Sequence, residues 1–298
     1  MPTTRHAKTI QGAILDCLSY YAVFGLRLNS KQLFELIHCK ATVVAVESAL
    51  TSLRRKKAVV GYKDGSFGIA GHHYPKQNPH TLEQTRLLAK ARRLGKVLRL
   101  IPWIKSIVVI NSVAYGNCTD KSDIDLLFVT SPHRLYITKG IVYYLLNLFR
   151  LRETPTQKAG RFSTGWWLTT NGVKFERDLM PTAELQLPYW SIMAKPVHGE
   201  KVWEQLLASS PFLRDQFPNY SFKHHGLPIH LFHLGFLDRL DSRGFRVHLR
   251  HVAMQEKYKQ PNAFLRIRPD LIVQNSDAKA QLKKISNKYQ TIRDKAGK

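Results

Sequence analysis

Hydrophobic residues in the first quarter of the chain recur at intervals of three and four, which is the spacing of one face of a helix. Over residues 8–70 this spacing predicts three short helices in succession. Ser30 is expected to cap the second helix, and the third is expected to begin at Thr42. Asp64 and Gly65 then lie between two apolar runs, which favours a tight β-hairpin. The pattern therefore predicts a small helical domain that ends in a hairpin.

The periodicity changes after a segment rich in His, Pro and Gln at residues 71–80. The pattern beyond it predicts a helix from Thr81, strands over 104–110, 123–129 and 161–169, and a helix over about 132–151. From residue 182 onward the pattern is helical. Residues 279–298 are polar and charged, and they are expected to form a frayed helix or a tail.

Together these patterns predict an α+β protein with three regions. Three helices followed by a hairpin are typical of a winged helix-turn-helix domain, here assigned to residues 1–72. Strands and helices in mixed order predict a core with a mixed sheet over residues 80–180. A basic, helical C-terminal region is expected over residues 181–298.

Charge points to a polyanionic partner. Lys and Arg together number 46 and Asp and Glu 21, so the formal net charge is +25. An excess of this size attracts polyanions, and nucleic acid is the first expectation. The candidate phosphate contacts lie at the end of the third helix and in the hairpin: Arg54, Arg55, Lys56, Lys57 and Lys63. The alternative interpretation of this cluster is a solvated helix end that the helix dipole favours.

The compartment expected from the sequence is the cytoplasm. No apolar run reaches the ~20 residues that a membrane span needs, and the first residues contain no apolar signal core. No membrane partner is therefore expected. The three cysteines are odd in number and lack metal-ligand spacing, which favours free thiols in a reducing compartment.

Two aspartates at the start of a predicted strand form the strongest candidate for chemistry. Side chains in a strand alternate between its faces, so Asp123 and Asp125 are expected to point the same way, with Ile124 facing the core. Two carboxylates this close repel each other unless a cation neutralises them. Carboxylate oxygens suit Mg²⁺ (or Mn²⁺), which commonly binds one or two carboxylates together with phosphate oxygens.

The surrounding residues resemble the signature of the nucleotidyltransferase superfamily to which DNA polymerase β belongs. The similarity covers the stretch from Val108 to Leu126, in which a small residue follows a strand, a polar loop comes next, and Asp-x-Asp opens the following strand. The resemblance implies a nucleoside triphosphate (NTP) substrate, Mg²⁺, and transfer of a nucleotidyl group to a hydroxyl. It assigns metal binding and catalysis to Asp123 and Asp125, and triphosphate binding to Ser112 and the adjacent Asn111.

The chain departs from that signature at two positions. Asn111 stands where the family has glycine, so a side chain lies where backbone approaches phosphate. Active members also carry a third carboxylate on a later strand, whereas residues 161–169 contain none. Glu176 or Asp178 is the candidate for that role, and the alternative is that both are ordinary surface charges.

Two functions follow from these observations. The first is a Mg²⁺-dependent nucleotidyltransferase that acts on or near nucleic acid. The second is a regulator that binds nucleic acid and has a catalytically silent nucleotidyltransferase-like core. Asn111 and the missing third acid favour the second, and the Asp123/Asp125 pair favours the first. The acceptor, the preferred NTP and the oligomeric state are not indicated by the sequence.

Overall fold

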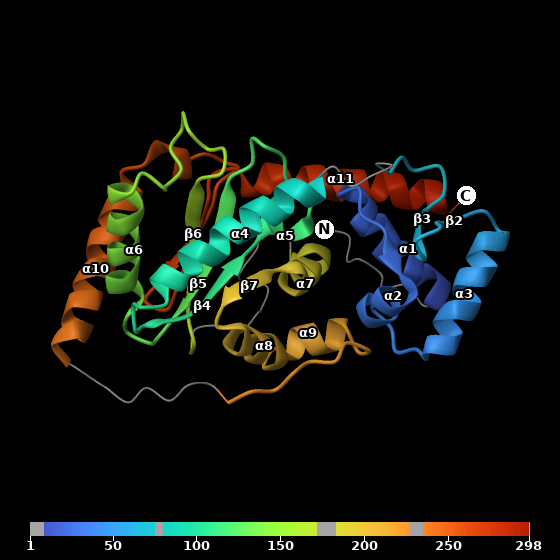
Figure 1. The fold of residues 1–298 in the computed structure, drawn as a ribbon, viewed down its shortest axis with the longest axis horizontal. Helices are drawn as coiled ribbons and strands as arrows, with labels where there is room; N and C mark the ends of the chain where they lie inside the picture. Colours follow the sequence, from blue (N-terminus) through green and yellow to red (C-terminus); the bar gives the residue numbers. More distant parts are fainter. Residues whose placement is uncertain (1–8, 75–79, 172–182, 227–234, 298) are drawn as a thin grey trace. The chain divides into compact units, whose positions relative to one another are not determined.

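The structure is a computed structural model that describes residues 9–74, 80–171, 183–226 and 235–297 (Figure 1). The chain divides into two compact units, each built from separate stretches of sequence. Unit 1 contains residues 1–78, 211–222 and 280–298, and unit 2 contains residues 79–210 and 223–279. The expected C-terminal region, 181–298, is thus divided between the two units.

Unit 1 combines helices with a small antiparallel sheet whose strand order is β1-β3-β2. Its elements are α1 (Ile10–Val23), β1 (Leu28–Asn29), α2 (Ser30–Leu36), α3 (Val43–Arg55), β2 (Val59–Gly61), β3 (Ser66–Ile69), α9 (Pro211–Gln216) and α11 (Ala278–Ala296). The three predicted helices and the hairpin are confirmed for the described residues. The core of the unit includes Ile14, Leu18 and Leu33, which are fully buried.

Polar caps set where the first three helices begin. Thr9 and Thr42 each accept a backbone N–H from the first turn of the helix that follows, so the predicted start of the third helix at Thr42 is correct. The predicted cap at Ser30 is wrong. Asn29 caps α2 instead, in a reciprocal arrangement with Gln32 in which each side chain accepts the other residue's backbone N–H at 2.9 Å.

The last stretch of the chain is an ordered helix rather than the expected frayed helix or tail. Tyr289 and Ile292 of α11 are buried, with 5 % and 6 % of their surfaces exposed. Arg293 forms an ion pair with Asp16 of α1, and the Tyr289 hydroxyl donates to the same carboxylate at 3.3 Å. The composition of the segment is polar because only one narrow stripe of the helix packs against the unit.

Unit 2 is built on a six-stranded sheet with the order β7-β4-β5-β6-β9-β8. The strands are β4 (Ile104–Val109), β5 (Ile124–Thr130), β6 (Phe162–Thr169), β7 (Lys195–His198), β8 (Phe264–Arg268) and β9 (Leu271–Asn275). Only β5 and β6 pair in parallel; the other pairs are antiparallel. The helices are α4 (His80–Leu98), α5 (Asn111–Tyr115), α6 (Leu135–Leu148), α7 (Ala183–Met193), α8 (Glu200–Ala208) and α10 (Gly235–Ala253), with a short 3₁₀ turn at Glu256–Tyr258.

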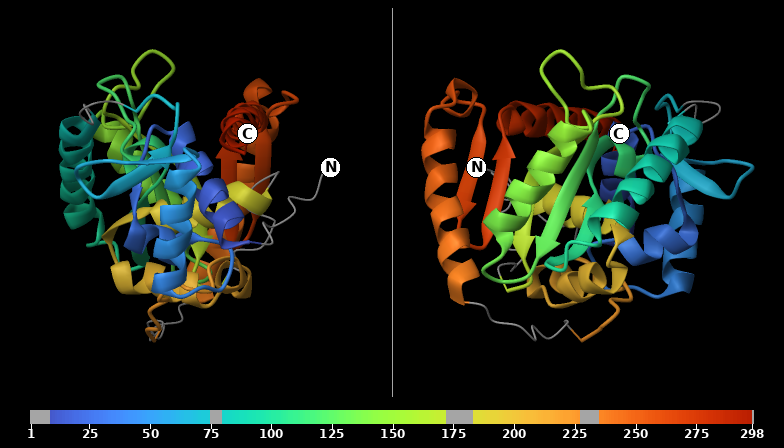
Figure 2. Two further views of the ribbon diagram at one scale, coloured as in Figure 1. Left: turned by 90° about the vertical axis from the view of Figure 1, so that its right-hand side faces the viewer. Right: turned by 60° about the vertical axis from the view of Figure 1, so that its left-hand side comes forward.

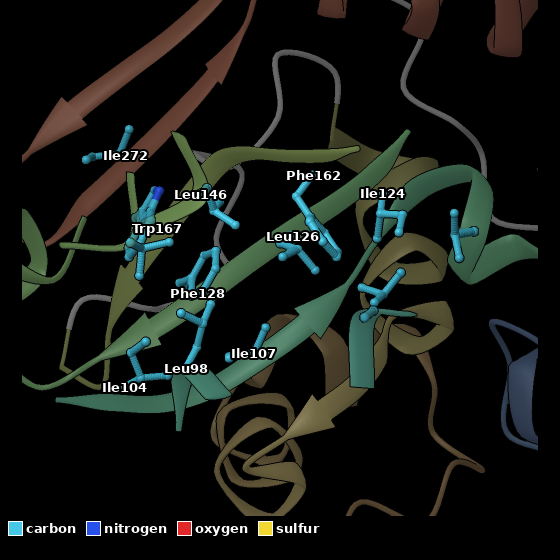
Figure 3. Packing of buried hydrophobic residues seen from close by; sticks show 14 of the residues in the cluster. Leu98, Ile104, Ile107, Ile124, Leu126, Phe128, Leu146, Phe162, Trp167 and Ile272 are labelled. Atoms are coloured by element: carbon cyan, nitrogen blue, oxygen red, sulfur yellow. The ribbon is translucent and has the colours of Figure 1, made fainter. Parts of the chain in front are cut away.

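The main core of unit 2 covers one face of this sheet (Figure 3). Alternate residues of β5, namely Ile124, Leu126 and Phe128, contribute to it, as the period of two in a strand requires. The Phe128 ring stacks on the Trp167 indole with centroids 4.3 Å apart. Helices α4, α6 and α10 close this core, since residues from all three pack in the same cluster.

Three strands appear where the sequence predicts a C-terminal region of helices. Strand β7 extends the sheet beside β4, and the hairpin β8–β9 extends it beside β6. Strand β7 contains Pro196. Because β7 is an edge strand of the sheet, the missing N–H of proline removes no hydrogen bond between central strands. Gly199 ends β7 with φ +64°, and a Cβ there would lie 1.9 Å from the Lys105 carbonyl oxygen, so only glycine permits this approach.

Cys17, Cys39 and Cys118 are all free thiols. Among the described residues, no helix is both long enough and apolar enough to cross a membrane.

Candidate active site

The start of β5 places two carboxylates on one side of the sheet. Asp125 is the second residue of the strand and Asp123 precedes it, and both are half-buried. Ile124 between them is fully buried in the core on the opposite face, as the alternation predicts. Because β5 pairs in parallel with β6, Asp125 lies in register with Ser163. The pair predicted from the sequence is therefore where two neighbouring parallel strands begin.

Asn111 lies directly beside this pair. It opens the short helix α5 immediately after β4, and its φ of +58° is in the left-handed region that glycine favours. Its side-chain Nδ2 donates to Asp125 Oδ2 at 2.9 Å, and its Oδ1 accepts the Trp190 indole N–H, also at 2.9 Å. The indole thereby fixes which end of the amide faces Asp125.

Ser112 follows in the first turn of α5 and is half-buried. Its carbonyl accepts the N–H groups of Gly116 at 3.0 Å and Asn117 at 3.2 Å, which closes the turn. Gly116, with φ +81°, ends the helix in the left-handed conformation. The four predicted site residues, Asn111, Ser112, Asp123 and Asp125, are thus gathered around the ends of β4 and β5.

A third acid, Glu153, belongs to the same group. It lies between α6 and β6, where its backbone N–H donates to the Phe162 carbonyl at 3.0 Å. Its carboxyl group hydrogen bonds with that of Asp123. Sequence reasoning missed Glu153 because the residue precedes the strand in an irregular segment, where no periodicity places a side chain. The expected candidates, Glu176 and Asp178, lie outside the described residues.

Mutual repulsion and burial shift the protonation of this group. Burial, followed by the charge of Asp123, raises the pKa of Asp125 to about 7, although the Asn111 amide acts in the opposite direction. Burial and the hydrogen bond with Asp123 also raise the pKa of Glu153. The Ser163 side chain hydrogen bonds with both raised acids and lowers the pKa of each. The site therefore holds more negative charge than its surroundings neutralise.

The donor chemistry of these three acids fits a divalent cation. Carboxylate oxygens are the ligands that Mg²⁺ prefers, and the raised pKa values mark charge that a cation offsets. In the described part of the chain, however, no three His, Cys, Asp or Glu side chains are gathered as the ligands of one ion. Glu153 hydrogen bonds with Asp123, and Asp125 with Asn111, so binding an ion requires these side chains to rotate.

The basic residues predicted to contact nucleic acid all lie in unit 1 and are exposed: Arg54, Arg55, Lys56, Lys57 and Lys63. The first four continue from the last turn of α3, and Lys63 lies in the turn between β2 and β3. Lys56 makes one polar contact, from Nζ to Gln11 Oε1 at 3.3 Å. The cluster is therefore exposed, as both contact with nucleic acid and a solvated helix end require.

Comparison with known proteins gives no match: no family model, no curated protein and no solved structure matches this chain.

Proposed function

We propose that unit 2 is a Mg²⁺-dependent nucleotidyltransferase and that Asp123, Asp125 and Glu153 are its catalytic carboxylates. The observation that carries the proposal is the third acid. Glu153 hydrogen bonds with Asp123 and raises the pKa of Asp125 through its charge. Three acids brought together where two parallel strands begin destabilise the protein when no cation is bound. A metal ion bound to phosphate would neutralise them.

The proposed reaction moves a nucleotidyl group from an NTP to a hydroxyl. The acceptor oxygen forms a bond to the α-phosphorus, the bond from that phosphorus to the bridging oxygen breaks, and pyrophosphate leaves. When bound, Mg²⁺ supplies positive charge to the phosphate and attacking oxygens. Asp123 and Asp125 would hold it. Glu153, whose pKa burial and the hydrogen bond with Asp123 raise, would accept the hydroxyl proton.

Nucleic acid is the proposed acceptor, with unit 1 as a winged helix-turn-helix that binds it. The element order α1-β1-α2-α3-β2-β3 and the sheet order β1-β3-β2 support this assignment. The exposed basic cluster at the end of α3 and in the β2–β3 turn gives the domain groups that contact phosphate. The net charge of +25 has the sign that such a partner requires.

Transfer of label from α-labelled NTPs to total RNA or to the protein itself tests the activity, with Mg²⁺ or Mn²⁺ present. We expect label in the wild type, none in Asp123→Ala/Asp125→Ala, and a loss of at least about a hundredfold in Glu153→Gln, because general base catalysis contributes roughly 10²–10⁴-fold. Glu200→Gln, an exposed acid at the start of α8, is the matched control and is expected to retain activity. Transfer that survives the double substitution contradicts the proposal.

A second function is favoured by one observation, the Asn111 side chain. It stands where the family that the sequence resembles has glycine, and it donates to Asp125, the acid proposed to bind metal. This contact favours a regulator that binds nucleic acid and has a silent core. If no NTP labels any acceptor but the protein shifts duplex in a gel, with shifts that weaken in salt and in Arg54→Ala/Arg55→Ala, the regulator replaces the enzyme.

A further inference from the structure

Helix α10 exposes a stripe of arginines. Their spacings of four, three and four residues place them on one side of the helix, opposite the buried Asp241 and Val252. The stripe consists of Arg239, Arg243, Arg246 and Arg250, and all four are exposed. Within the described part of the chain none of them forms an ion pair, although acidic groups of the same helix such as Asp238 are paired. The positive charge of the stripe is therefore available to a partner.

A second, apolar stripe runs beside the arginines. Phe236 is 60 % exposed, Leu240 50 % and Val247 58 %, and Met254, just after the helix, is 73 % exposed. Since each residue advances about 100° around a helix, this stripe lies immediately next to the arginine stripe and away from the buried side. Large apolar side chains exposed in a row are unusual on a surface that meets only water. The outer side of α10 is therefore both cationic and apolar.

A pocket between α4 and α6 has the same character. Its volume is about 380 Å³, and its lining is almost wholly apolar, formed among others by Leu94, Val97, Leu145, Phe149 and Phe162. Two cationic side chains, Lys90 and Arg93, also border it. Val97 and Phe149 at its mouth are 59 % and 65 % exposed. A pocket of this kind suits a hydrocarbon chain that carries an anionic group.

These features belong to one side of unit 2, which we name the helical face and define as the outer surface of α4, α6 and α10. The right-hand view of Figure 2 shows the three helices side by side in front of the sheet. The shared core supports this placement, because Leu87 of α4, Val142 of α6 and Phe245 of α10 pack in the same cluster. Tyr144 and Leu148 of α6 add exposed apolar surface between the pocket and α10.

We propose that the helical face docks on the surface of an anionic lipid bilayer, with the arginines of α10 at the headgroups and its apolar stripe below them. Helices that combine basic and apolar residues lie in the plane of such an interface. The pocket between α4 and α6 would take an acyl chain. Docking of this kind requires no spanning helix, and it does not depend on the proposed transferase activity.

A lipid surface explains more of the helical face than nucleic acid does. Contacts to phosphates use Arg and Lys and need neither a row of exposed aliphatic side chains nor an apolar pocket. Both are present here beside the cations. The observations therefore favour lipid for the helical face.

Sedimentation of the full chain with vesicles tests the proposal. We expect binding to phosphatidylcholine vesicles that contain phosphatidylglycerol and none to phosphatidylcholine alone. Arg243→Gln/Arg246→Gln should weaken partitioning roughly tenfold or more, from the contribution of each arginine near an anionic surface. Lys283→Gln/Lys284→Gln removes the same charge from exposed positions of α11 and should change partitioning by less than about twofold.

Charge-neutral substitutions separate docking from simple attraction. Leu240→Ser/Val247→Ser, and separately Val97→Ser/Phe149→Ser, should each weaken vesicle binding several-fold at unchanged charge, while circular dichroism and melting temperature stay those of the wild type. The proposal fails if these variants bind as the wild type does, or if the α11 control loses as much as the α10 variant. It also fails if vesicles are not bound and the α10 arginines instead govern binding to RNA.

Discussion

The two faces of strand β5 differ within consecutive residues. Ile124, Leu126 and Phe128 are buried in the main core of unit 2. On the other face, Asp125 contacts the amide of Asn111, which the Trp190 indole holds in turn. The first face contributes to stability through buried apolar area. The second carries charge whose burial opposes folding, since burial raises the pKa of Asp125.

This difference indicates how the strand supports chemistry. Packing of the apolar face fixes the backbone of β5, and this backbone positions the carboxylates on the opposite face. The strand thereby holds charged groups in a partly buried place that is unfavourable for them. Beyond Asp125 the second face is apolar as well, because Leu127 and Val129 are buried. The acidic part of this face is confined to the first residues of the strand, where β4 ends, β5 and β6 begin, and Glu153 lies nearby.

The largest effect is expected on the apolar face. Phe128→Ala removes a fully buried ring stacked on Trp167, and it should lower the free energy of unfolding of unit 2 by about 3–5 kcal/mol. Urea unfolding followed by tryptophan fluorescence measures the change. Phe236→Ala, at an exposed position of α10, is the matched control with an expected cost below about 0.5 kcal/mol. Equal costs would show that the core described for this face does not determine stability.

The opposite sign is expected on the acidic face. Asp125 binds its proton more tightly in the folded protein, so its charge destabilises the fold progressively as pH rises from about 4 to the folded pKa of about 7. Asp125→Asn should therefore stabilise the metal-free protein by roughly 1–2 kcal/mol above pH 7, after solvent screening of the half-buried site. The advantage should shrink toward pH 4.

Melting temperatures of the wild type and Asp125→Asn across pH 4–8, with a chelator present, provide the measurement. The same variant should lose nucleotidyl transfer. A variant that is less stable than the wild type at pH 8 would mean that Asp125 is a net stabilising residue, and the contrast between the two faces would then be wrong.

The smallest effect is expected from the contact behind the site. Trp190→Phe keeps a six-membered aromatic ring but removes the indole N–H that holds the Asn111 amide, and loss of this hydrogen bond alone costs about 1 kcal/mol. Released from the indole, Asn111 should donate less well to Asp125. Because that hydrogen bond lowers the pKa of Asp125, the pKa should rise further, and the pH dependence of stability should move upward. Leu187→Met on the same helix is the packing control.

The sequence was informative where periodicity is long and regular. The helices of unit 1, helix α4 and strands β4, β5 and β6 all follow from apolar spacing and turn residues. The placement of Asp123 and Asp125 on the face opposite Ile124 also followed, since side chains alternate along a strand. The expected cap at Ser30 was wrong by one residue, because Asn and Ser compete equally for that role.

What escaped prediction depends on contacts between distant parts of the chain. Strands β8 and β9 are five residues each and join the sheet only because β6 offers an edge. Glu153 reaches Asp123 through the pairing of an irregular segment with Phe162, which no local pattern encodes. The sequence did not predict that the apolar stripe of α10 is exposed. Its residues are spread over nineteen positions, and they can be assigned to the outer side of the helix only when the buried side is known.

Unit 1 combines segments that are far apart in the sequence, and this affects when the unit can fold during synthesis. Residues 280–298 complete this unit, and Tyr289 and Arg293 contact Asp16 near its beginning. Synthesis proceeds from the N-terminus, so the first helices emerge from the ribosome long before the segment that covers them. Unit 1 therefore cannot complete its packing until unit 2 has been translated and α11 has left the ribosome.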